Sequence, residues 1–122
     1  MTWTLDNDRP IYLQIMEIIQ RDIISGKYKA GDKLPSVRDL ALAAAVNPNT
    51  MQKALAELER NGLVRSQRTS GRFITEDLEM IRTLKHSLAR EHINEFIEKM
   101  KQLGFEEDEL CDLLIQRLKG ES

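Results

Sequence analysis

Residues 35–62 read PSVRDLALAAAVNPNTMQKALAELERNG, and this stretch contains the start and stop signals of two short helices. Ser36 and Asp39 have the spacing of a capping box, with Asp in place of the usual Glu or Gln. They predict a short, alanine-rich helix over about 37–45, whose small side chains allow another helix to approach closely.

A second helix is predicted almost directly after the first. Asn47 is a favourable N-cap and Pro48 a favourable first helical residue. Apolar residues recur at helical spacing from Met51 to Leu58, before Gly62. Glycine is favoured after the end of a helix because it adopts positive φ without a Cβ penalty. Two short helices joined by a turn of three or four residues predict a helix-turn-helix.

The pattern changes after Gly62, where two short β-prone runs flank a polar loop. The runs are 63–66 and 72–75, and the loop 67–71 reads QRTSG. A glycine-bearing loop between two such runs predicts a β-hairpin. A helix-turn-helix followed by a hairpin is a winged helix-turn-helix, so the expected fold is mostly α with one small β-hairpin.

Helices are also predicted on both sides of this motif. Upstream, an apolar stripe predicts a helix over about 10–25, with Asp8 as its cap. Residues 27–34 are expected to form a turn and a connecting segment. Downstream, helical spacing predicts a long helix over about 76–103 and a last helix over about 106–119. The acidic start and basic end of the last helix complement its dipole.

The long helix has an apolar stripe that a domain of this size cannot cover. About 28 residues at 1.5 Å each span roughly 40 Å, and the last helix can fold back over part of the stripe. A second copy of the chain is the natural cover for the rest. Residues 76–122 are therefore expected to form a two-helix dimerisation tail. The expected contacts are Leu84, Leu88, Ile93, Phe96, Ile97, Met100, Leu110, Leu113, Leu114 and Leu118.

Length and charge agree with a winged domain, residues 1–75, followed by this tail. The chain has 122 residues, of which 41% are apolar and 31% charged, and its net charge is −2. Residues 1–75 carry 11 basic and 8 acidic side chains, whereas residues 76–122 carry 7 and 12. A nucleic-acid surface is therefore expected in the basic front part.

Several classes of protein are excluded on similar grounds. A single cysteine, Cys111, excludes an internal disulfide framework, and we expect it to be a small packing residue. No apolar run approaches the length of a membrane span and no leader pattern occurs, so we expect a cytoplasmic protein. His86 and His92 have poor metal-ligand spacing, and no phosphate-cradling glycine loop occurs. We therefore expect that the protein is not an enzyme and that it has no catalytic residue, no metal-binding residue and no cofactor.

The second helix of a helix-turn-helix places its N-terminal part in the major groove, where side chains read base edges. Asparagine and glutamine can bond adenine bidentately, whereas lysine and arginine prefer guanine or phosphate. We therefore expect contacts with double-stranded DNA from a recognition helix over 48–61 and a wing over 63–75. The candidate residues are Ser36, Arg38, Asn47, Pro48, Asn49, Thr50, Gln52, Lys53, Arg68, Thr69, Ser70, Gly71 and Arg72.

Some of these residues also have a purely structural interpretation. Ser36 and Asn47 can be helix caps alone. Lys53 can pair with Glu57, four residues later, on a solvated face, and Arg72 can be an ordinary surface charge. The combination favours nucleic-acid binding, because polar residues, basic flanks and hairpin all fall on the surface that a winged helix uses.

Linked motifs in this region resemble the GntR family of bacterial transcription regulators, in particular its short YtrA-like subfamily. The matching segments are PIYLQI (10–15), GDKLPSVRDLA (31–41), VNPNTMQKAL (46–55), LERNGLV (58–64) and GRFI (71–74). The resemblance implies that Arg38 contacts DNA, that residues 49–53 belong to the recognition helix and that Gly71 lies in the wing. The wing departs from the family pattern Gly-x-Gly-x-Phe-Val, because Thr69 replaces the first glycine. The short tail implies no large effector-binding domain.

We therefore expect a homodimeric repressor that binds the two halves of a palindromic operator. The resemblance implies repression of the regulator's own operon and adjacent transporter genes. The main alternative is a winged helix that binds a protein, with the acidic tail docking a basic partner. A third alternative is binding of double-stranded RNA. The sequence does not decide whether a small-molecule effector binds.

Overall fold

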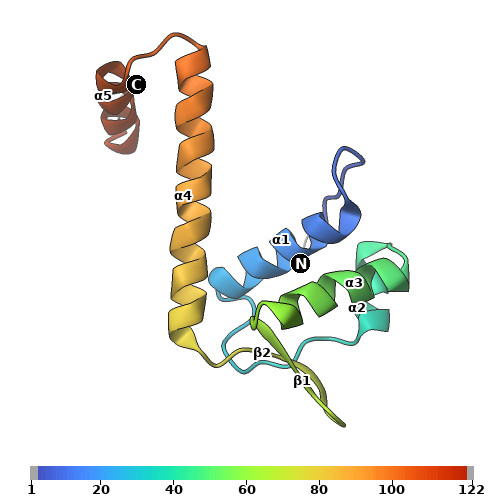
Figure 1. The fold of residues 1–122 in the computed structure, drawn as a ribbon. Coiled ribbons are helices and arrows are strands. Elements are labelled where there is room, and N and C mark those ends of the chain that lie inside the picture. The colour runs from blue at the N-terminus through green and yellow to red at the C-terminus, as the bar shows by residue number, and fades with distance from the viewer. Residues whose placement is uncertain (1–2, 121–122) are drawn as a thin grey trace. The chain divides into compact units, whose positions relative to one another are not determined.

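The computed structural model describes residues 3–120, which form five α-helices and a two-stranded antiparallel hairpin (Figure 1). The mostly helical architecture with one small hairpin confirms the predicted fold class. In chain order the elements are α1 (Ile11–Ile24), α2 (Val37–Ala44), α3 (Pro48–Arg60), β1 (Val64–Gln67), β2 (Gly71–Ile74), α4 (Leu78–Gln102) and α5 (Glu107–Leu118).

The described residues divide into two compact units, one ending at Lys85 and the other beginning at His86. The first turns of α4 belong to the first unit, where Ile81 and Leu84 pack against its core. This unit therefore extends beyond the predicted boundary at Thr75, because the winged fold covers the first apolar side chains of α4. Leu84, a predicted dimer contact, is one of these covered side chains.

The core of the first unit lies where α1 and α2 pack against α3, with the hairpin closing one end (Figure 1). Full burial of one large aliphatic side chain contributes about 1.5–3 kcal/mol, so burial of these residues strongly stabilises the unit. The largest fully buried apolar side chains are Ile15, Ile19, Met51, Leu55, Leu58, Val64 and Ile74.

Local capping sets the turn of the helix-turn-helix. The Ser36 hydroxyl accepts a hydrogen bond from the Asp39 N–H (3.1 Å), and the Asn47 side-chain oxygen accepts one from the Asn49 N–H (2.8 Å). Both predicted caps are confirmed. α2 ends one residue earlier than predicted, because Ala45 adopts the left-handed conformation with φ of 56° and directs the chain toward α3.

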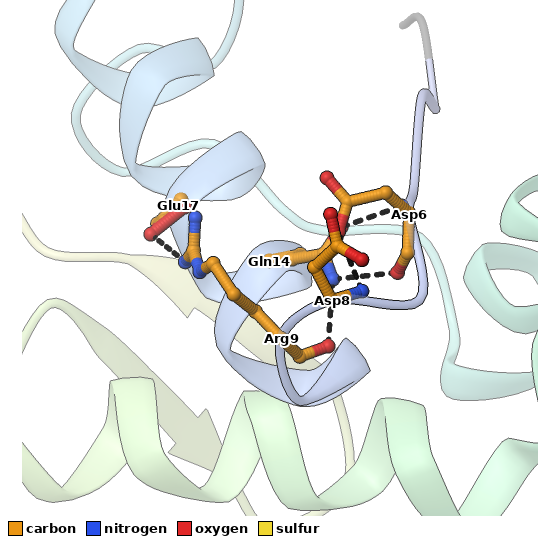
Figure 2. Close-up of polar contacts among 5 residues, drawn as sticks. All are labelled: Asp6, Asp8, Arg9, Gln14 and Glu17. Carbon is orange, nitrogen blue, oxygen red and sulfur yellow. Dashed lines mark hydrogen bonds and ion pairs between the residues drawn. The ribbon is translucent and has the colours of Figure 1, made fainter.

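The predicted cap of α1 is wrong. Pro10 occupies the N-cap position and its side chain makes no capping hydrogen bond, whereas Asp8 lies outside the helix. The buried Gln14 holds the preceding segment instead (Figure 2). Its amide nitrogen donates to the carbonyls of Asp6 (2.9 Å) and Arg9 (2.8 Å), and its oxygen accepts from the Asp6 N–H (2.9 Å). A side chain on α1 thus replaces a local cap.

β1 and β2 form the wing, with Val64 opposite Ile74 and Gln67 opposite Gly71. Each strand is displaced by one residue from its predicted range, which shortens the loop to residues 68–70. Gly71 begins β2 with φ of 104°, a conformation that favours glycine.

The segment 32–34, predicted to be part of a turn and connecting segment, pairs with β2. Lys33 lies opposite Phe73 in an antiparallel bridge. The Leu34 N–H donates to the Arg72 carbonyl (2.9 Å), and the Ile74 N–H donates to the Asp32 carbonyl (2.8 Å). These backbone hydrogen bonds connect the segment before α2 directly to the wing.

The second unit consists of the remainder of α4 and α5. A capping box formed by Glu106 and Glu109 starts α5, and Leu110 is buried. Cys111 is exposed, so its predicted packing role is wrong for a single chain. Most of the other predicted dimer contacts in this unit are exposed: Ile93, Phe96, Leu113, Leu114 and Leu118. Leu88, Ile97 and Met100 are half-buried. No helix within residues 3–120 is both long and apolar enough to cross a membrane.

Candidate nucleic-acid interface

The N-terminal half of α3 presents a row of polar side chains on its outer face. Helical periodicity turns Met51, Ala54 and Leu55 into the core, and the intervening positions therefore point outward. Asn49, Gln52 and Lys53 are exposed, as are Asn47 and Pro48 at the tip, and Thr50 is half-buried. These six residues are candidates for contact with base edges.

α2 and the wing carry a second group of candidates, four of which line one open hollow. Ser36 and Arg38 are exposed at the start of α2, where free backbone N–H groups and the helix dipole favour an anion. The hollow, of about 650 Å³, has walls from the start of α2, the connecting segment before it and the wing. Its lining includes Lys33, Ser36, Asp39, Ser70, Gly71 and Arg72. The structure therefore brings Ser36 together with Ser70, Gly71 and Arg72.

The wing loop is exposed throughout: Arg68, Thr69 and Ser70 all face solvent. Among residues 3–120, Ala45 is the only non-glycine residue with positive φ. Thr69 therefore adopts an ordinary backbone conformation, and the loop does not require the glycine that the family pattern has at this position. The adjacent Gly71 retains the positive φ.

Lys53 does not pair with Glu57 as its spacing predicts. Its ammonium lies 4.0 Å from the centroid of the Tyr12 ring on α1, a cation–π contact. Glu57 accepts a hydrogen bond from Arg60, three residues later (2.5 Å). Tyr12 was not among the predicted site residues, and the contact links helices that helical spacing alone cannot relate.

Arg72 lies in β2 and contacts α3 rather than extending from the exposed loop. Its Nε donates to a carboxylate oxygen of Glu59 on α3, and the hydroxyl of Ser66 donates to the same oxygen. Burial opposes ionisation of Glu59, but the hydrogen bonds from Ser66 and Arg72 and the Arg72 charge outweigh it and lower the pKa of this carboxyl. Neither Glu59 nor Ser66 was among the predicted site residues.

A three-helix core with a wing, and exposed amide and basic side chains on its recognition helix, defines a winged helix-turn-helix DNA-binding protein. Residues 11–74 match the family model of the bacterial regulatory proteins of the gntR family. The chain belongs to this family, and the predicted family is confirmed.

Relatives in the same family are transcription regulators rather than enzymes. The chain is 42% identical over 106 residues to the HTH-type transcriptional regulator YhcF of Bacillus subtilis, covering 87% of this chain and 88% of that protein. It is 40% identical over 94 residues to the HTH-type transcriptional repressor YtrA of the same species, covering 77% of this chain and 68% of YtrA.

Solved structures share the fold. A GntR family transcriptional regulator from Listeria monocytogenes superposes with a TM-score of 0.85 and 38% identity, over 92% of this chain and 98% of that one. The DNA-binding domain of AraR, solved in complex with operator ORX1, has a TM-score of 0.56 and 27% identity, over 59% of this chain and 93% of that domain.

Proposed function

We propose that this GntR-family regulator is a repressor that binds a palindromic operator as a homodimer, in the cytoplasm. The observation that carries the proposal is the outward-facing row of polar residues at the start of α3, beside the exposed start of α2 and the wing. Amide side chains in this position can read base edges in the major groove. The operator complex of the related AraR domain supports the same use of this fold.

Each half of the operator would receive one recognition helix, 48–61. Asn49 and Gln52 are the proposed base-reading residues, because their amides can bond adenine bidentately. The wing, 63–75, lies on the backbone or in the minor groove. The other proposed contacts, with a base edge, phosphate or sugar, are Ser36, Arg38, Asn47, Pro48, Thr50, Lys53, Arg68, Thr69, Ser70 and Gly71.

The proposed dimer would bury the exposed apolar side chains of the second unit. Seven leucine, isoleucine and phenylalanine residues in the described part of this unit are 40–78% exposed, which is costly for a chain that stays monomeric: Ile93, Phe96, Leu103, Leu113, Leu114, Ile115 and Leu118. Dimers of helix-turn-helix proteins bind half-sites one helical turn apart, about 34–36 Å, or a multiple of that distance, and we expect the same spacing here.

Selection of bound duplexes from a random pool tests this proposal, because it reports sequence, symmetry and half-site spacing together. We expect a palindrome, and we expect Asn49→Ala/Gln52→Ala to lose most of the preference for it, about 1–3 kcal/mol per base-reading side chain. The matched control is Asn94→Ala/Gln116→Ala, which removes two exposed amides from the tail and should bind as the parent does.

Salt dependence separates this proposal from a winged helix that binds a protein. Operator affinity should fall steeply between about 50 and 200 mM salt, because phosphate contacts release counterions. A folded, dimeric chain that binds no duplex at low salt would contradict the proposal, as would a double-alanine variant that binds the selected duplex like the parent.

A further inference from the structure

One carboxylate joins the recognition helix to both strands of the wing. Glu59 lies in the last turn of α3 and accepts hydrogen bonds from Ser66 on β1 and Arg72 on β2. Ser66 and Arg72 are register partners, opposite each other in the hairpin. Glu59 therefore contacts the two strands at one level and can fix the angle at which the hairpin leaves α3. We refer to Glu59, Ser66 and Arg72 as the wing junction.

Partial burial distinguishes Arg72 and Glu59, but not the exposed Ser66, from the loop that extends beyond the wing junction. The side chains of Arg72 and Glu59 are 20% and 29% exposed, whereas Arg68 in the loop is exposed. A partly buried charge-assisted hydrogen bond is stronger than an exposed ion pair, and its geometry is better defined. The positive charge of Arg72 is thus already compensated inside the protein.

Lys33 supplies a second exposed cation next to the wing. Its Cε lies 3.3 Å from the position that a Cβ would occupy on Gly71, so its side chain runs along the start of β2. The backbone bridge between Lys33 and Phe73 holds it there. Lys33 lines the same hollow as Ser36, which is a proposed phosphate contact.

We propose that Arg72 and Glu59 are positioning residues that set the wing against the recognition helix, and that Lys33 and Arg68 join Arg38 as cations that contact DNA phosphates on this side of the protein. This inference rests on the proposed function. It adds Lys33 to the interface and assigns Arg72, expected from the sequence to contact DNA, to the support of the wing.

The salt dependence of binding to a duplex of arbitrary sequence tests the assignment of the cations, because it counts neutralised phosphates without requiring the operator. Binding of the full chain is measured by fluorescence anisotropy between about 50 and 200 mM salt. Arg68→Gln and Lys33→Gln should each reduce the slope of log affinity against log salt by about 0.9 for each protomer that contacts the duplex, or about 1.8 for a bound homodimer. Arg72→Gln removes no phosphate contact of its own and should reduce the slope by less than either substitution. A reduction for Arg72→Gln equal to that for Arg68→Gln would overturn the proposal.

Hydrogen exchange of the DNA-free protein tests the positioning role. Arg72→Gln and Glu59→Gln should accelerate exchange in peptides covering residues 64–74, because each weakens the wing junction. Glu59→Gln keeps the side-chain length and removes only the charge. It therefore keeps the test valid if Arg72→Gln does not fold. Arg68→Gln is the matched control and should exchange like the parent. Parent-like exchange in both junction variants would refute the positioning role.

The two measurements test the phosphate contacts and the positioning role independently of each other. A parent chain that binds no duplex at any of these salt concentrations would refute the proposed function, and with it the phosphate contacts of Lys33 and Arg68. Accelerated exchange in the junction variants would still support the structural half of the inference.

Discussion

Ala45 occupies the left-handed region at the turn between α2 and α3, with φ of 56°. This conformation costs a residue with a Cβ about 1–2 kcal/mol, and glycine avoids the cost while losing more chain entropy on folding. We expect Ala45→Gly to raise the free energy of unfolding by about 0.5–1 kcal/mol. Urea unfolding followed by circular dichroism, at one protein concentration, measures the change.

Ala43 is the matched control, because it is exposed and lies within α2. Glycine within a helix is less favourable than alanine by about 1 kcal/mol, so Ala43→Gly should lower the free energy of unfolding. Opposite signs at two positions two residues apart would attribute the effect to backbone conformation. Equal destabilisation by both variants would show that Ala45 is not strained.

At the scale of an element, the segment before α1 depends on one side chain in that helix. Gln14 makes three hydrogen bonds to the backbone of Asp6 and Arg9 (Figure 2). Trp3, the only tryptophan in the chain, lies in the same segment, nearer the N-terminus. It is half-buried and packs against the core. Together with Asn47 and Thr50, Trp3 lines a hollow of about 450 Å³ next to the start of α3. The fluorescence of Trp3 therefore reports whether this segment is packed against the core.

We expect Gln14→Ala to release the segment, because three hydrogen bonds lose their partner at a cost of about 0.5–1.5 kcal/mol each. The emission of Trp3 should shift to longer wavelength and become more accessible to acrylamide. Gln20→Ala, on the same helix, is the control and should leave the emission unchanged. Parent-like emission from Gln14→Ala would mean that apolar contacts of Trp3 hold the segment without the amide.

At the scale of the whole molecule, the prediction concerns the tail. Phe96 and Leu114 are 40% and 43% exposed in a single chain. If the tail pairs two copies, Phe96→Asp/Leu114→Asp should convert a dimer into a monomer of 14.1 kDa, because two charges would be buried in an apolar interface. Size-exclusion chromatography with light scattering measures the mass. Asn94→Asp/Gln116→Asp adds the same charge at exposed polar positions and should remain dimeric. A monomeric parent would contradict the dimer.

Much of the fold could be predicted from the sequence, because the signals that define it act over a few residues. Ser36 and Asn47 cap helices through bonds to N–H groups two or three residues later. Gly62 has a positive φ, as its position after a helix indicates. The start of α3, and therefore the row of amides proposed to read bases, follows from Asn47 and Pro48 alone.

The sequence by itself thus determined the order of the elements, the recognition helix and the family. Only the tertiary structure decided which partners the side chains have. It joined Glu59 to Arg72, Lys53 to Tyr12, and Gln14 to the segment before its own helix. The physical reason is the sequence separation over which each interaction acts. A cap or a turn depends on the conformation of neighbouring residues, whereas these contacts depend on how separate helices and strands pack together.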